Sequence, residues 1–297
     1  LSEDDWQVAF DKYKQYPEYQ KINQGMLLPE FKVIFMYEYL HRVLGRLIGL
    51  LYFLPLVFFA ARGMIKRSLM PPLLALFVLG GCQGLMGWYM VKSGLVDRPD
   101  VSQYRLTAHL GLAVMVYGFI IWLIVRLRSP GRGAAPGTSW APLWLVALIY
   151  LMILSGGFVA GTDAGYSYPT WPLMGESFIP PALYADGWIS AFEQVTTIQF
   201  NHRLFAYFLL VVVLITGVWN FLKSADPRVR ATALGLMAAL AVQVTLGISA
   251  LLTHIAIPVA AAHQSGAIIL LTVAILFAHA RITERSHYVD IVASRRP

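Results

Sequence analysis

Four of the seven histidines in this chain fall at matched positions where imidazole chemistry is expected. His41, His109, His202 and His263 each lie in the first one or two turns of a long apolar run. Ionisable groups inside a bilayer are costly and need a partner. A single histidine of this kind is explained by a hydrogen bond to a neighbouring helix. Four at matched positions predict two pairs of metal ligands, His41 with His109 and His202 with His263.

The kind of metal site follows from what accompanies these histidines. Two imidazoles from facing helices, with no carboxylate or thiolate cluster, suit a six-coordinate heme better than zinc, which takes four ligands. The many Phe, Tyr, Trp and Met residues would line a macrocycle, although such residues also fill ordinary cores. Cys82 is the single cysteine and predicts neither a disulfide nor a cysteine metal site. The remaining histidines, His254, His279 and His287, are predicted to lie at the surface.

One acidic residue distinguishes the two histidine pairs. Glu38 and Gln199 each precede the first histidine of their pair by three residues, on the same helix face. A carboxylate exchanges a proton with a reacting carbon or stabilises a developing cation, and an amide does neither. Glu38 is therefore the predicted catalytic residue. The alternative is a structural ion pair between Glu38 and Arg42 or Arg46.

Other polar residues accompany the histidines. Four arginines are candidate partners for heme propionates, although phospholipid headgroups would serve equally well: Arg42, Arg46, Arg105 and Arg203. Gln83 and Gln243 each precede a glycine by four residues. That pattern favours close helix packing with a polar link between the helices.

These motifs recur in the same order in two halves of the chain. The His-Arg pair precedes Gln-x-x-x-Gly by 42 residues in one half (83 − 41) and by 41 in the other (243 − 202). The second histidine follows the glutamine by 26 residues (109 − 83) and by 20 (263 − 243). Matched order and spacing predict a duplicated four-helix bundle. Because three apolar spans precede the one that should open the second bundle, we expect a helix to be missing before Leu1.

The composition predicts the elements that carry these residues. The chain has 297 residues, of which 58% are hydrophobic and 13% charged, roughly half the charge of a typical soluble domain. A disordered chain, a nucleic-acid-binding domain and an ordinary cytosolic enzyme all fit poorly. The apolar runs predict an all-α polytopic membrane protein with two pseudo-symmetric helical bundles. Seven spans are expected at about 34–61, 71–92, 104–126, 141–160, 197–222, 229–253 and 258–280.

Domain organisation and orientation follow from these spans. Residues 1–33 are polar and aromatic and predict a soluble segment with one or two short helices. The N-terminal bundle is expected at 34–132, and the C-terminal bundle at 133–297, including a long loop at 161–196. Lysines and arginines number 13 on one face and 7 on the other. The richer face, with the C-terminus, is therefore predicted to be cytoplasmic or matrix-facing, and the loop and residue 1 lie outside.

Several stretches closely resemble heme A synthase, in its proteobacterial and mitochondrial branch. They cover essentially the whole chain and come in the family's order: WQVAFDKYKQYPEYQKINQGM and EFKVIFMYEYLHRVLGRLIG between Trp6 and Gly49, GWYMVKSGL after Cys82, YRLTAHLG, FVAGTDAGYSYPTWPLMGESFIP, FNHR and AAHQSG. The resemblance implies eight transmembrane helices in two four-helix bundles. It also implies oxidation of the C8 methyl of heme O to a formyl group, giving heme A for cytochrome oxidases.

The resemblance further implies roles for individual residues. The N-terminal half would hold the substrate heme between His41 and His109, and the C-terminal half a resident heme b between His202 and His263. Glu38 matches the family's essential carboxylate. The family's first helix is absent here, in agreement with the repeat. The cysteine pair that some bacterial relatives carry in outer loops is also absent from this sequence.

Partners and rival functions complete these expectations. The expected partners are heme O, heme O synthase as its donor, an unidentified electron donor or acceptor and the lipid bilayer, with no nucleic acid; a homo-oligomer is left open. The membrane would be a bacterial inner membrane, or alternatively the mitochondrial inner membrane.

A quinol-linked diheme b-type cytochrome is the alternative function, and it needs no carboxylate beside only one heme. A transporter with a two-fold repeat would place its polar residues near the bilayer midplane, unlike this chain.

Overall fold

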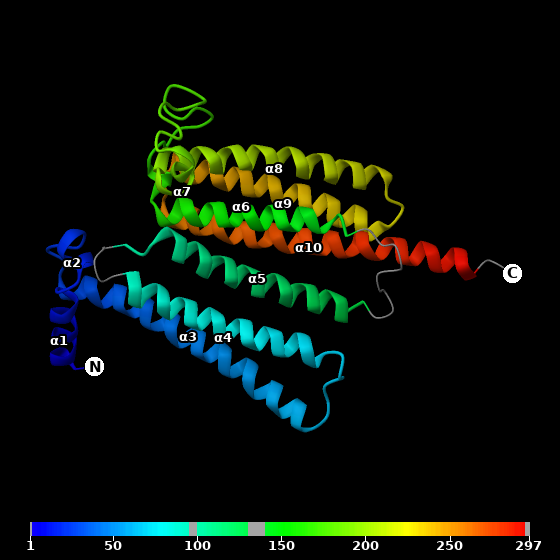
Figure 1. The fold of residues 1–297 in the computed structure, drawn as a ribbon, viewed down its shortest axis with the longest axis horizontal. Coiled ribbons are helices and arrows are strands. Elements are labelled where there is room, and N and C mark those ends of the chain that lie inside the picture. The colour runs from blue at the N-terminus through cyan, green and yellow to red at the C-terminus, as the bar shows by residue number, and fades with distance from the viewer. Residues whose placement is uncertain (1, 95–99, 130–139, 295–297) are drawn as a thin grey trace. The chain divides into compact units, whose positions relative to one another are not determined.

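The regular elements of the protein are helices. The computed structural model describes residues 2–94, 100–129 and 140–294, with side chains described as far as Glu284 in the last helix (Figure 1). Within these residues, seven helices are long and apolar enough to cross a membrane. The prediction of an all-α polytopic membrane protein is therefore confirmed.

The helix bounds follow the predicted spans closely. The spans are α3 (Leu28–Ala61), α4 (Met70–Gly94), α5 (Gln103–Leu127), α6 (Leu143–Gly161), α8 (Val195–Lys223), α9 (Pro227–Leu252) and α10 (Ile257–Ser294). The shorter helices are α1 (Glu3–Tyr13), α2 (Pro17–Lys21), η1 (Ala164–Tyr166), η2 (Gly187–Ile189) and α7 (Ser190–Glu193). Two predicted ends were wrong, because α3 begins before residue 34 and α10 continues well past residue 280.

Local hydrogen bonds explain the earlier start of α3. Its first turn contains Pro29, which suits a position where no backbone donor is needed. The Glu30 carboxylate accepts a hydrogen bond from the Leu27 backbone N–H at 2.8 Å. This polar turn lies outside the apolar run, so hydropathy alone could not include it in the span.

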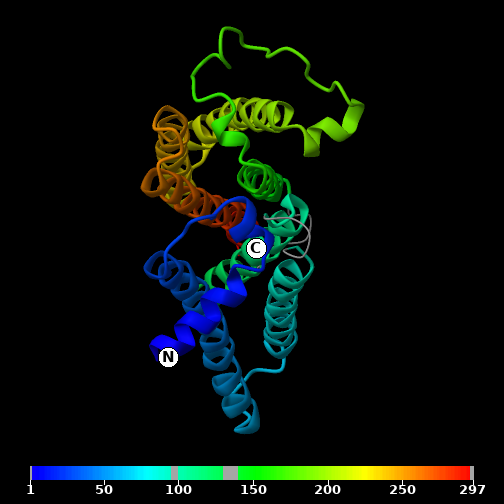
Figure 2. The same ribbon diagram turned by 90° about the vertical axis from the view of Figure 1, so that its left-hand side faces the viewer.

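The chain divides into two compact units, Leu1–Val116 and Tyr117–Pro297. In the second unit α6, α8, α9 and α10 form a closed four-helix ring, because α6 contacts α8 and α10, and α9 contacts the same two helices. Figure 2 views these helices from one end of the bundle. Each helix contributes fully buried apolar side chains to the centre: Ile149, Val213, Leu236, Leu271 and Phe277.

The division falls inside α5 and not at the predicted boundary between residues 132 and 133. The second half of α5 packs on α10, where the Tyr117 hydroxyl lies 2.7 Å from the Thr272 hydroxyl. Farther along, the Trp122 ring meets the His279 ring edge to face. His279 is therefore only 6% exposed, and the prediction that it lies at the surface was wrong. His254 is exposed as predicted, and the side chain of His287 lies outside the described residues.

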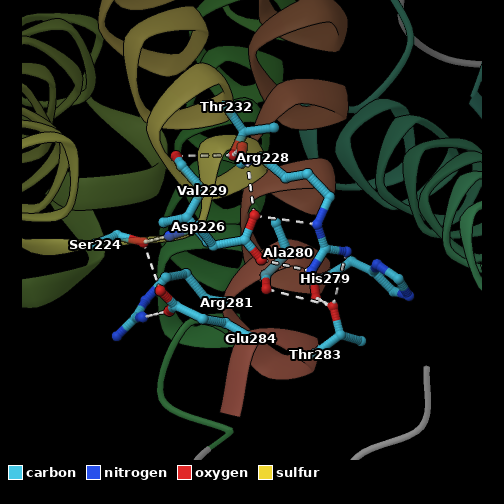
Figure 3. A network of polar contacts seen from close by, with 10 residues as sticks. All are labelled: Ser224, Asp226, Arg228, Val229, Thr232, His279, Ala280, Arg281, Thr283 and Glu284. Atoms are coloured by element: carbon cyan, nitrogen blue, oxygen red, sulfur yellow. Dashed lines mark hydrogen bonds and ion pairs between the residues drawn. The ribbon is translucent and has the colours of Figure 1, made fainter. Parts of the chain in front are cut away.

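A polar network fixes the end of the ring where α8 turns into α9 (Figure 3). Asp226 caps α9 by accepting the Arg228 backbone N–H at 2.8 Å, and it also binds the Arg228 guanidinium at 2.6 Å. The same guanidinium reaches the Thr283 hydroxyl on α10 at 3.5 Å. The Ser224 hydroxyl donates to Glu284 at 2.5 Å. These contacts stabilise the polar part of α10 that follows residue 280.

In the first unit, residues 2–27 include two short helices, as predicted. An aromatic cluster joins α1 to the start of α3 through edge and tilted ring contacts: Trp6, Phe10, Tyr13, Phe31 and Phe35. Lys32 binds Glu3 at 2.9 Å across the same junction. Beyond it, α3 contacts α4.

Candidate functional site

The C-terminal histidine pair lies across the four-helix ring. His202 is on α8 and His263 on α10, which are diagonal members of the ring, since each contacts α6 and α9. Both side chains are half-buried. The structure thus places the two imidazoles that the sequence paired on opposite members of one ring of helices.

A serine of α6 orients the His202 ring. The Ser155 hydroxyl lies 3.0 Å from His202 Nδ1. If Nδ1–H donates to this hydroxyl, Nε2 keeps its lone pair for a metal. Sequence analysis missed Ser155. The available signal was the small triplet from Ser155 to Gly157 within an otherwise apolar helix, since small residues let helices approach closely.

A glutamine and a glycine of α9 form a cradle for His263. The Gln243 amide donates to the His263 backbone carbonyl at 3.0 Å, and the same nitrogen lies 3.2 Å from Nδ1 of the ring. A Cβ on Gly247 would lie 2.9 Å from Cε1 of His263. Only glycine leaves room for the imidazole there. The predicted packing with a polar link is confirmed, and its partner is the histidine itself.

The same cradle recurs in the first unit. The Gln83 amide donates to the His109 carbonyl at 3.1 Å and lies 3.5 Å from the ring Nε2. A Cβ on Gly87 would lie 3.0 Å from His109 Cε1. Residues four apart share a helix face, so one Gln-x-x-x-Gly segment both links and accommodates the neighbouring histidine. The sequence repeat therefore corresponds to a repeated contact.

Glu38 lies on α3 in the same unit, three residues before His41. His41 is exposed on α3, and His109 is half-buried on α5. The Glu38 carboxylate binds Arg42 at 2.5 Å, and both side chains are 53% exposed. The two residues are four apart on one helix, so the pair forms within α3 itself.

The candidate propionate partners occupy different surroundings. Arg42 binds Glu38, Arg46 is exposed on α3, and the Arg105 guanidinium lies 5.2 Å from the centre of the Tyr89 ring. Arg203 is buried and donates to backbone carbonyls of the long loop. Its Nε has no protein partner, so one donor remains for a carboxylate.

The residues present fit a heme. Within the described residues, no group of three or more His, Cys, Asp or Glu side chains could hold a metal ion. Heme iron needs only two axial ligands from the protein. Buried polar atoms normally have partners, yet the buried side-chain atoms without one gather around the histidines: Gln83 Oε1, Thr107 Oγ1, His109 Nδ1, Gln199 Oε1, Arg203 Nε and Gln243 Oε1. A ligand with polar edges would supply their partners.

The fold defines a multi-pass membrane protein. The family model of the cytochrome oxidase assembly proteins matches residues 1–275. The chain is 48% identical over 286 residues to "Heme A synthase" of Nitrosospira multiformis, covering 94% of this chain and 80% of that protein. It is 45% identical over 282 residues to "Heme A synthase" of Parvibaculum lavamentivorans, covering 94% and 81%. The chain belongs to this family, and the resemblance seen in the sequence is confirmed.

Proposed function

We propose that this protein is a heme A synthase, which oxidises the C8 methyl of heme O to a formyl group and so provides heme A for cytochrome oxidase. The observation that carries this proposal is the histidine cradle, present in both repeats, with a carboxylate beside only one of them. Family membership supports it, because relatives that are 45–48% identical over 94% of this chain carry that name. The diheme b-type cytochrome is not supported, since these relatives are named for a synthase.

The two histidine pairs take different roles in this proposal. His202 and His263 would hold a resident heme b, with Ser155 and Gln243 fixing the two rings. When bound, heme b supplies electron-transfer chemistry. His41 and His109 would ligate heme O, the substrate.

Glu38 would manage protons at the substrate. If water supplies the oxygen, converting a methyl to a formyl group releases four protons and four electrons, and the separate electron partner would accept the electrons. Glu38 shares a helix face with His41, so its carboxylate would lie beside the heme that His41 would bind. There it would accept a proton and offset positive charge on the reacting carbon. Arg42 is the partner of this carboxylate within α3.

Placement and partners extend the proposal. The protein is a multi-pass membrane protein. We place it in a bacterial plasma membrane, because the relatives named above are bacterial, with the C-terminus on the cytoplasmic side. Heme O synthase as donor and a separate electron partner stay predictions.

The test is a Glu38→Gln variant expressed in cells that make heme O. We expect both hemes to remain bound while the heme A yield falls at least about 100-fold, the usual contribution of a general acid or base. Heme O or a partly oxidised intermediate should accumulate. Heme types are quantified by extraction, chromatography and mass.

The matched control is Glu30→Gln on the same helix, where the new amide can still accept from Leu27. This variant should make heme A at the normal rate. Normal heme A from Glu38→Gln would make Glu38 a structural partner of Arg42 and overturn its catalytic role.

A further inference from the structure

Two buried side chains of α8 hold the long loop that joins α6 to α8. Gln199 is 2% exposed, and its amide donates to the carbonyls of Gly165 at 3.3 Å and Tyr168 at 3.2 Å. Both carbonyls belong to the first part of the loop, at and just after η1. A glutamate could not replace Gln199, because an ionised carboxylate has no N–H group to donate to these two carbonyls.

Arg203, one turn farther along α8, holds the next part of the same loop. It is 8% exposed, and its guanidinium donates to the carbonyls of Tyr168 at 2.6 Å, Thr170 at 2.8 Å and Leu173 at 3.3 Å. Charged donors make stronger hydrogen bonds than neutral ones. The fork geometry of the guanidinium lets one side chain reach three carbonyls, which the single ammonium of a lysine cannot match.

The far end of the loop is fastened to the same stretch of α8. The Tyr184 hydroxyl donates to Asn201 at 3.0 Å, and the Tyr184 backbone N–H reaches the Thr197 hydroxyl at 3.4 Å. The loop is therefore attached to α8 on both sides of His202. Figure 1 shows it at the end of the unit where α8 begins.

The corresponding residues of the first unit do something else. Glu38 and Arg42 occupy the positions of Gln199 and Arg203 relative to their histidine, and they bind each other at the surface. The duplicated pair has thus diverged. One copy fastens a loop, and the other leaves its histidine exposed.

We propose that Gln199 and Arg203 are positioning residues that hold the loop as a fixed cover over the His202 end of the C-terminal heme site. The inference rests on the proposed function for the presence of that heme. The cover explains how one protein retains a resident heme while exchanging another. Arg203 Nε is a buried donor without a protein partner, and it would be available to a carboxylate of the retained heme.

The first test measures whether the loop is fixed, and it needs no heme. Cys82 is replaced by Ser, and a cysteine is introduced at Ala164, which is 0% exposed. Its rate of reaction with a maleimide is followed in purified protein. Arg203→Lys and Gln199→Glu should each raise this rate about tenfold or more, because the loop opens more often. A cysteine at the exposed Ser167 should react at the same rate in every background.

The second measurement concerns heme retention. The rate at which heme b passes to excess apomyoglobin, and its reduction potential, are recorded for the same variants. We expect heme loss at least about tenfold faster in Arg203→Lys, although the charge is kept, because the fork contacts are lost. Arg230→Lys, at an exposed site on α9, is the matched control and should change neither quantity. Gln199→Asn provides a milder variant if the others do not fold.

The outcomes separate this inference from the proposed function. Unchanged Ala164→Cys reactivity in both variants would show that the loop is not held by these residues. Faster labelling with unchanged heme loss and potential would overturn the role of the cover. If the unmodified protein makes no heme A, while its variants show both faster labelling and faster heme loss, the proposed function would be refuted and the role of the cover would stand.

Discussion

At the residue scale, His109 and His263 are positioned by the same two partners, a glutamine amide on the backbone carbonyl and a glycine beneath the ring. The glutamine fixes the position of the helix that carries the histidine. The glycine sets how closely the imidazole approaches the helix that carries the glutamine. Neither partner needs to contact a heme to control the ligand. Axial ligands generally depend on such surrounding contacts for their orientation.

A methyl group at Gly247 tests this arrangement. Gly247→Ala would place a Cβ 2.9 Å from His263 Cε1, so the ring must tilt or the helices must separate. Overpacking of this kind costs about 1–3 kcal/mol, and heme b occupancy should fall roughly tenfold at limiting heme. Absorbance of reduced heme b per protein measures it.

Gly235→Ala is the control on the same helix, because its Cβ would meet Val273 at an ordinary 3.5 Å. It should leave heme b content unchanged. Equal heme b content in both alanine variants would mean that the glycine cradle does not govern ligation.

At the element scale, the position of α10 depends on contacts at both ends. Its start carries His263, and its later turns are tied to the α8–α9 turn through Ser224, Arg228 and Glu284 (Figure 3). Under the proposed function His263 is an axial ligand, so α10 would have to keep its register against the facing helix. The network therefore supports the site from a distance.

Removing the α9 cap should weaken the C-terminal unit. Asp226→Ala loses the cap and leaves Arg228 without its nearest carboxylate, which costs about 1–2 kcal/mol. We expect the apparent melting temperature in detergent to fall by roughly 2–8 °C. Asp186→Ala, at an N-cap without a side-chain hydrogen bond, should leave it unchanged. A melting temperature unaffected by Asp226→Ala would mean that the cap contributes nothing.

At the scale of the whole molecule, the uneven distribution of basic residues predicts orientation. The richer face should stay in the cytoplasm, which places the long loop on the opposite side. Ser167 in that loop is exposed. In a Cys82→Ser background, Ser167→Cys should react in intact cells with a membrane-impermeant thiol reagent that reaches the periplasm. Labelling only after the inner membrane is broken would reverse the predicted topology.

The sequence by itself determined the seven spans and the repeat. A helix needs about 20 apolar residues to cross the hydrocarbon, so α4 and α6 could be placed within two residues from hydropathy alone. The family and the paired histidines were likewise readable, because they depend on residue types and spacing along the chain.

Only the tertiary structure decided what the polar residues between the spans contact. Hydropathy measures preference for an apolar environment and does not distinguish lipid from protein, so it could not bury His279 or assign the second half of α5 to the C-terminal unit. Nor could it show that Gln199 and Arg203 hold a loop some 30 residues earlier in the chain. Such contacts join residues far apart in sequence, and their geometry exists only once the helices pack.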